Sequence, residues 1–215
     1  GYEIVFKRTY PATVNDLTPL LSDLKASKPD IVIGGGHLAD GQLFTQQMDD
    51  LGINPKALSL VAAVTIPAFQ SALKGKADGV MGPSHWEYGV TFSKEKARKA
   101  GQTWIGPSQD EFVKLFKDAI GRDLRPEYHA AEAGAAVLSL VLAVEKAASL
   151  DSDKVRAAMG DLKFTSFYGG WAIDKPGKQV GHDMIDAQWQ KGNLVIVVPE
   201  AAATGALLYP KPAIK

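Results

Sequence analysis

The sequence predicts an α/β fold in which helices flank a parallel sheet. Short apolar runs alternate along the chain with segments in which apolar residues recur every three or four positions. The first pattern is typical of strands covered on both faces, and the second of amphipathic helices. A strand–helix–strand rhythm of this kind favours parallel strands joined by right-handed crossovers.

The first part of the chain carries this rhythm. Leu17 to Leu24 have helical spacing, Asn15 or Asp16 can cap that helix, and Pro29 ends it. A second helix follows the glycines 34–36 and ends at Gly52, and a third is expected at 67–73. Strands are expected at residues 4–6, 31–33, 58–61 and 80–81.

The remainder predicts consecutive helices and then a hairpin. Ser108 and Glu111 form a capping box for a helix that Gly121 closes. A long, nearly all-apolar helix is expected from 127 to 148, and a short one around 155–159. Later strands are expected at 168–171, 187–190 and 194–198, and residues 200–215 are expected to form a loosely ordered tail.

Composition and charge exclude several classes of protein. The 215 residues include 24 basic and 24 acidic side chains, so the formal net charge is zero and provides no long-range attraction to nucleic acid. The absence of cysteine excludes disulfides and thiolate chemistry. The longest apolar stretch, 133–144, is shorter than the roughly 20 residues that a membrane span requires.

The glycine turn is the sharpest local motif. Gly34, Gly36 and Ala39 fit a dinucleotide-binding fingerprint, but the next strand ends in the apolar run 61–64 instead of an acid. Gln42 stands where a phosphate loop needs lysine. A tight strand-to-helix turn is the interpretation we prefer. Such a turn would still expose helix N–H groups to a cleft, which suits a carboxylate or another polar group.

No catalytic, metal or cofactor site is predicted. The four histidines lack metal-ligand spacing, and neither a nucleophile elbow nor a paired set of carboxylates appears. His37 differs because it follows the carboxyl end of a parallel strand, where such sheets bind ligands. Trp86 and Tyr88 follow the last strand of the first region, as an aromatic wall over a ligand or as core packing.

The whole chain resembles the second half of a periplasmic solute-binding protein of the branched-chain amino acid (Leu/Ile/Val-binding) type. These receptors feed ABC importers. The stretches that carry the resemblance, in order, are 1–10 with Asp16, 24–30, 34–36, 42–52, 77–86, 112–128, 143–147, 170–177 and 188–199.

The resemblance implies a type I periplasmic-binding-protein clamshell, present as an incomplete part. Residues 1–83 and 183–199 would belong to the C-terminal lobe, which would lack its first strand and helix. Residues 88–178 would form the helical part of the N-terminal lobe, most of which would be absent, and 200–215 the tail. The apolar helix 127–148 would then need cover from the missing half, or from a dimer or swapped assembly.

The resemblance also implies a ligand-binding set. His37 matches a position where amino-acid binders of this family place an aromatic side chain, and Tyr128 lies near where the N-terminal lobe approaches the ligand. Val61 or Ala62 falls where those proteins use an acid to hold an ammonium group, so we expect a ligand without a free α-ammonium, or one held from outside this chain. With Trp86, the expected set is His37, Val61, Ala62, Trp86 and Tyr128.

The expected function is that of an extracytoplasmic receptor, periplasmic or membrane-associated, which is not an enzyme. It would capture a small organic solute, amino-acid-like or a small carboxylate or aromatic acid, and deliver it to the permease of an ABC importer. The alternatives are a nucleotide-dependent enzyme on a doubly wound sheet and a ligand-sensing regulatory domain of the same clamshell.

Overall fold

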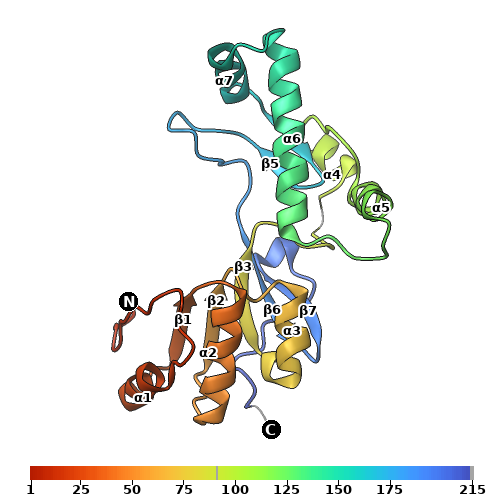
Figure 1. Ribbon diagram of the computed structural model, residues 1–215. Helices are drawn as coiled ribbons and strands as arrows, with labels where there is room; N and C mark the ends of the chain where they lie inside the picture. Colours follow the sequence, from red (N-terminus) through yellow and green to blue (C-terminus); the bar gives the residue numbers. More distant parts are fainter. Residues whose placement is uncertain (91, 214–215) are drawn as a thin grey trace. The chain divides into compact units, whose positions relative to one another are not determined.

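The computed structural model describes residues 1–90 and 92–213. The chain forms two compact units (Figure 1). Unit 1 comprises Gly1–Ser84 and Ile185–Lys215, and unit 2 comprises His85–Met184.

Unit 1 is built on a five-stranded sheet in the order β1-β2-β3-β6-β7. The first three strands are parallel, as the strand–helix rhythm predicts, whereas β6 and β7 are antiparallel and form the predicted hairpin. The sheet is therefore mixed. The strands are β1 (Ile31–Gly35), β2 (Ala57–Val61), β3 (Val80–Ser84), β6 (Ile185–Gln190) and β7 (Asn193–Val198).

One face of this sheet packs on helices to form the core of unit 1. The N-cap residue of the first helix is Leu17, so the expected cap at Asn15 or Asp16 is wrong, although Asp16 Oδ1 accepts the Thr18 N–H of the first turn at 2.9 Å. The helices are α1 (Thr18–Ser27), α2 (Leu38–Asp50) and α3 (Pro67–Leu73), followed by the 3₁₀ turn η1 (Lys74–Ala77). The core residues include Val32, Leu58, Leu60 and Val80 from the strands and Phe44, Met48, Phe69 and Leu73 from the helices.

The predicted strand at 4–6 is wrong. Residues 1–10 have no regular secondary structure, and Ile4 is 78% exposed. A strand exists only by pairing, and β1, which lies at the edge of the sheet, does not pair with this segment. The prediction that 31–33 is buried on both faces is also wrong, because Val32 faces the core while Ile31 and Ile33 are 40% and 77% exposed.

The tail is better fixed than expected. The buried Gln188 side-chain amide donates to the Leu208 carbonyl at 3.1 Å, and its oxygen accepts the Leu208 N–H at 2.9 Å. The Lys211 N–H donates to the Lys56 carbonyl at 2.7 Å. These bonds hold the tail on unit 1, so the expectation of loose order is wrong for this part, while 214–215 lie outside the described residues. The tail begins with the 3₁₀ turn η2 (Glu200–Ala202).

Unit 2 consists of helices with a small two-stranded sheet. The capping box of Ser108 and Glu111 is confirmed, and Gly121 closes the helix at a φ of +64°. Neither the first helix nor the first strand of this unit is predicted from the sequence. The elements are α4 (Lys94–Lys99), α5 (Gln109–Ile120), α6 (Tyr128–Ala147), α7 (Ser152–Gly160), β4 (Phe164–Ser166) and β5 (Gly169–Trp171).

The long helix α6 buries small residues and exposes large apolar ones. Ala131, Ala135, Ser139 and Ala143 form its buried stripe. Val137, Leu140 and Val141, which we call the α6 apolar face, are 62%, 49% and 47% exposed. Among the described helices, none is by itself long and apolar enough to cross a membrane; α6 and α7 qualify only as a pair bent by 108°.

We predict that the α6 apolar face makes the isolated 215-residue chain associate or bind apolar dyes. The triple variant Val137→Lys, Leu140→Gln, Val141→Lys should reduce both, with unchanged helix content. Sedimentation velocity, dye fluorescence and circular dichroism measure these effects. Glu145→Lys, which changes the charge on α6 but removes none of the three apolar side chains, is the control. A monomeric wild-type chain without dye binding would contradict the prediction.

Candidate functional site

The carboxyl ends of β1 and β2 bring three of the predicted site residues to one edge of unit 1. Gly35 pairs with Val61 in the parallel register, so the residues that follow the two strands emerge side by side. His37 is exposed and Val61 is 44% exposed at this edge. Ala62 has a φ of +63°, a left-handed conformation that residues other than glycine adopt rarely and often at functional sites.

Close packing and one buried hydrogen bond fix the loop after β2. The Trp189 indole N–H donates to the Val64 carbonyl at 2.7 Å. A Cβ atom on Gly41 would lie 2.5 Å from the Ala63 Cβ, so only glycine allows the first turn of α2 to approach this loop. The positions of the neighbouring Val61 and Ala62 are therefore fixed by this loop.

The start of α2 carries a carboxylate that the sequence reasoning did not assign. His37 is the N-cap residue, and its backbone N–H donates to Asp40 Oδ1 at 2.7 Å. This N–H belongs to the turn where we expected a ligand carboxylate to bind. That expectation is wrong for the His37 N–H, because the chain supplies its own carboxylate there.

Tyr10 joins Asp40 at this edge. Its hydroxyl oxygen lies 2.8 Å from the Gly35 carbonyl oxygen and 2.9 Å from Asp40 Oδ2. Burial, then the hydrogen bond and negative charge of Asp40, raise the pKa of Tyr10 to about 12. The phenol is therefore neutral at physiological pH and acts as a hydrogen-bond donor.

The other two predicted site residues lie in unit 2. Trp86 is completely buried, donates from its indole N–H to the Phe167 carbonyl at 3.0 Å, and meets the Phe112 ring edge-on. Tyr128, the first residue of α6, is 9% exposed and stacks on the His129 ring at 3.9 Å between centroids. Burial, and then the charge of Glu132, raise the pKa of Tyr128.

The predicted set is thus divided: His37, Val61 and Ala62 share one edge of unit 1, while Trp86 and Tyr128 belong to unit 2. The two additional residues at the edge are Asp40 and Tyr10. An acid three residues after an N-cap is a recognisable signal, so the spacing of His37 and Asp40 could have revealed Asp40. Nothing in the sequence around Tyr10 indicates its partner.

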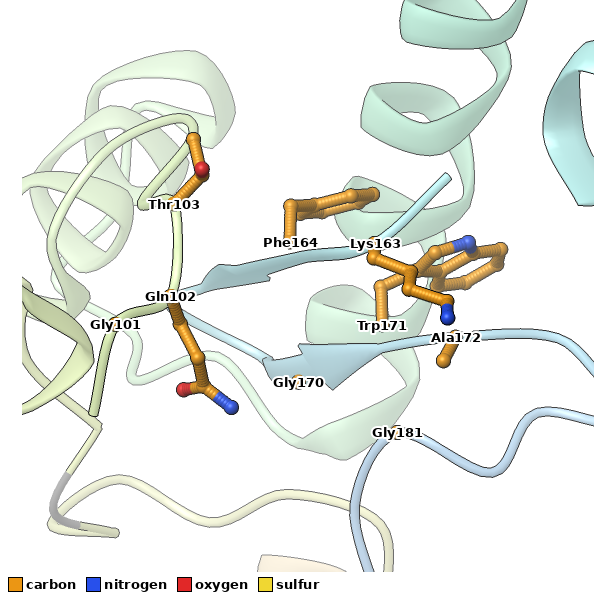
Figure 2. Close-up of a pocket in the computed structure, with 9 residues that line it drawn as sticks. All are labelled: Gly101, Gln102, Thr103, Lys163, Phe164, Gly170, Trp171, Ala172 and Gly181. Atoms are coloured by element: carbon orange, nitrogen blue, oxygen red, sulfur yellow. The ribbon is translucent and has the colours of Figure 1, made fainter. Parts of the chain in front are cut away.

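Two pockets form elsewhere in the units. One of about 300 Å³ in unit 2 is open to solvent and is lined mainly by residues 101–103 and the strands β4 and β5, with the rings of Phe164 and Trp171 stacked 5.9 Å apart (Figure 2). Another of about 610 Å³ lies in unit 1 beside Asp49, near the opposite end of α2 from His37. Neither is lined by a predicted site residue.

Metal binding finds no support in the described residues. Within residues 1–90 and 92–213, no group of three or more His, Cys, Asp or Glu side chains is arranged to hold an ion. The arrangement at the β1–β2 edge, an exposed imidazole beside apolar side chains and a carboxylate, is suited to contacting a small polar solute.

Comparison with known proteins places this geometry in context. A model of the family described as periplasmic binding protein matches residues 1–193. The Leu/Ile/Val-binding protein homolog 7 of Brucella abortus (strain 2308) is 27% identical over 216 residues, which cover 98% of this chain and 51% of that protein. The chain therefore spans about half the length of the curated relatives it matches.

Solved structures show the same fold. The leucine binding protein LivK of Thermotoga maritima MSB8 has a TM-score of 0.70 at 19% identity, over 88% of this chain and 49% of that one. A solute binding protein from R. palustris, solved in complex with benzoate, has a TM-score of 0.62 at 19% identity, over 90% and 49% of the two chains. The fold is thus the type I periplasmic binding protein fold, present in part.

We predict that Tyr10 ionises near pH 12 in the folded protein. Because folding raises this pKa above that of an unfolded tyrosine, the unfolded chain releases its proton first, and stability should fall as pH rises from 10 toward 12. The difference between alkaline absorbance titrations of the wild type and Tyr10→Phe isolates this residue. Asp40→Asn should lower the midpoint; a midpoint that stays the same would contradict the hydrogen-bonded pair.

We predict that Trp86→Phe destabilises unit 2 by about 2–4 kcal/mol, because it shrinks a buried side chain and leaves the Phe167 carbonyl without this donor. Chemical denaturation followed by tryptophan fluorescence and circular dichroism measures the change. Trp171→Phe is the matched control, since the buried Trp171 indole nitrogen has no hydrogen-bond partner among the described residues. Equal costs for both variants would show that the Trp86 hydrogen bond contributes little.

Proposed function

Because the chain belongs to the periplasmic binding protein family, we propose that it forms part of an extracytoplasmic receptor for a small organic solute. In this proposal the receptor delivers the solute to the permease of an ABC importer. The location is the periplasm, or the outer surface of a membrane to which the receptor is attached. The protein acts by binding and release, without a catalytic step.

One observation carries the proposal: three of the predicted site residues lie together at the carboxyl edge of a parallel pair of strands. Exposed His37 and Val61 and left-handed Ala62 line this edge, where open α/β sheets bind ligands. We propose that these residues contact the solute from unit 1 and that Tyr128 contributes from unit 2. Trp86, which the sequence also placed in this set, is completely buried and cannot contact a solute directly.

The assignment of the units to lobes is part of the same proposal. Residues 1–83 with 183–199 correspond to the C-terminal lobe, and 88–178 to the helical part of the N-terminal lobe. On this assignment, His37, Val61 and Ala62 belong to the C-terminal lobe and Tyr128 to the N-terminal lobe.

The proposed solute is amino-acid-like or a small aliphatic or aromatic acid. The name of the Brucella abortus relative refers to branched-chain amino acids, and the R. palustris protein was solved with benzoate. Apolar Val61 and Ala62 suit the apolar body of either kind of solute, and the exposed His37 ring can contact its polar part.

We predict that His37→Ala weakens solute binding by about tenfold, the loss of about 1.4 kcal/mol that one side-chain contact typically supplies. The solute is found by a thermal-shift screen of the natural full-length protein against the twenty amino acids, benzoate and short aliphatic acids, and affinity is measured by calorimetry.

Gln46→Ala is the control, because Gln46 lies on the same helix and bonds only to Asp50 in the described structure. His37→Ala should lower the melting temperature of the unliganded protein only slightly, since the Asp40 half of the capping box remains and only the His37 side-chain half is lost. Unchanged affinity would remove His37 from the site, and a screen without any binder would contradict the proposed function.

A further inference from the structure

The Tyr10 hydroxyl, the Gly35 carbonyl and the Asp40 carboxylate form a cluster of oxygen atoms at the β1–β2 edge, which we call the oxygen cluster. Tyr10 Oη lies 2.8 Å from one partner and 2.9 Å from the other. A hydroxyl has a single proton, so it donates to only one of them at a time. The cluster therefore holds three oxygens, one net negative charge and one hydrogen.

The other oxygen of Asp40, Oδ1, does not reduce this excess of hydrogen-bond acceptors in the cluster. Asp40 Oδ1 accepts the His37 N–H, which accounts for the capping role of the side chain but leaves Oδ2 in the cluster. None of the ion pairs among the described residues involves Asp40, so no Lys, Arg or His nitrogen there lies within 4.0 Å of its carboxylate. The negative charge is thus uncompensated by a side chain.

The backbone leaves room for this cluster only because residue 36 is glycine. A Cβ atom on Gly36 would lie 1.9 Å from Asp40 Oδ2 and 2.9 Å from the Tyr10 hydroxyl. The oxygens therefore lie directly against the turn that precedes His37. Asp40 is partly exposed, so its carboxylate remains accessible beside the exposed His37.

We propose that the oxygen cluster of Tyr10, Gly35 and Asp40 is a subsite for a nitrogen of the solute that carries N–H hydrogens, protonated or amide-like. This rests on the proposed function and names the polar group that unit 1 selects. Such a nitrogen supplies the hydrogens that the cluster lacks, and an ammonium also compensates its charge.

The same cluster disfavours a carboxylate. An anion at this turn would face the negative charge of Asp40, although a helix N-terminus otherwise attracts anions. The acid that is missing from the Val61–Ala62 position is therefore supplied within the chain, from the first turn of α2. The carboxylate of an amino-acid-like solute binds away from this turn.

The test compares solutes that differ only in the nitrogen. Calorimetry of the natural full-length protein uses two pairs of probes: leucine with 4-methylpentanoate, and phenylalanine with 3-phenylpropanoate. The wild type should bind the nitrogen-bearing member of at least one pair about tenfold or more tightly, as for one charge-assisted hydrogen bond.

Asp40→Asn should abolish most of this preference by weakening the nitrogen-bearing member, while the affinity for its partner stays the same. Asparagine retains an oxygen that accepts the His37 N–H, so the cap and the melting temperature should be preserved. Tyr10→Phe keeps the ring packing and removes only the hydroxyl, and should reduce the preference by a smaller factor. Asp50→Asn, at the far end of α2, is the control and should change nothing.

The outcomes separate the subsite from the receptor function. Binding of both members of a pair with equal affinity, or a preference that survives Asp40→Asn, would overturn the subsite and leave the receptor function standing. A failure of all four probes to bind would instead contradict the proposed function for this class of solute, and the subsite with it.

Discussion

The parallel pairing of β1 with β2 is the constraint on which the candidate site depends. Parallel neighbours must be joined by a crossover, and here α2 makes it, so both strands end at the same edge and α2 begins there. The register of Gly35 with Val61 then sets His37 near Val61 and Ala62 although they are more than twenty residues apart in the sequence. Asp40 is brought to the same place because it lies in the first turn of the crossover helix.

This arrangement reverses the electrostatic character that the turn would otherwise have. A strand, a glycine turn and a helix N-terminus usually present N–H donors and a partial positive charge. Here Asp40 Oδ1 accepts the N-cap N–H, and Oδ2 lies with the Tyr10 hydroxyl and the Gly35 carbonyl in the oxygen cluster. The edge therefore presents hydrogen-bond acceptors beside the apolar residues Val61 and Ala62.

Both units leave an apolar face accessible, for the same physical reason. Strands and helices bury a face only where another layer packs against it. In unit 1, Ile31 and Ile33 point to the side of β1 opposite the helices, and in unit 2 the α6 apolar face points away from the small residues that pack. Exposure of this extent on two separate units is typical of surfaces that another layer of polypeptide covers.

The sequence by itself determined the features that depend on a few neighbouring residues. Three such features are the capping box of Ser108 and Glu111, the left-handed Gly121 and the parallel strand–helix rhythm. They can be recognised from nearby residues because they reflect spacing within one turn or one strand. Only the tertiary structure decided that residues 4–6 form no strand, that Gln188 holds Leu208, and that Tyr10 meets Asp40. Strand pairing, burial and side-chain contacts of this kind require a partner far away in the chain, and the sequence around one partner carries no record of the other.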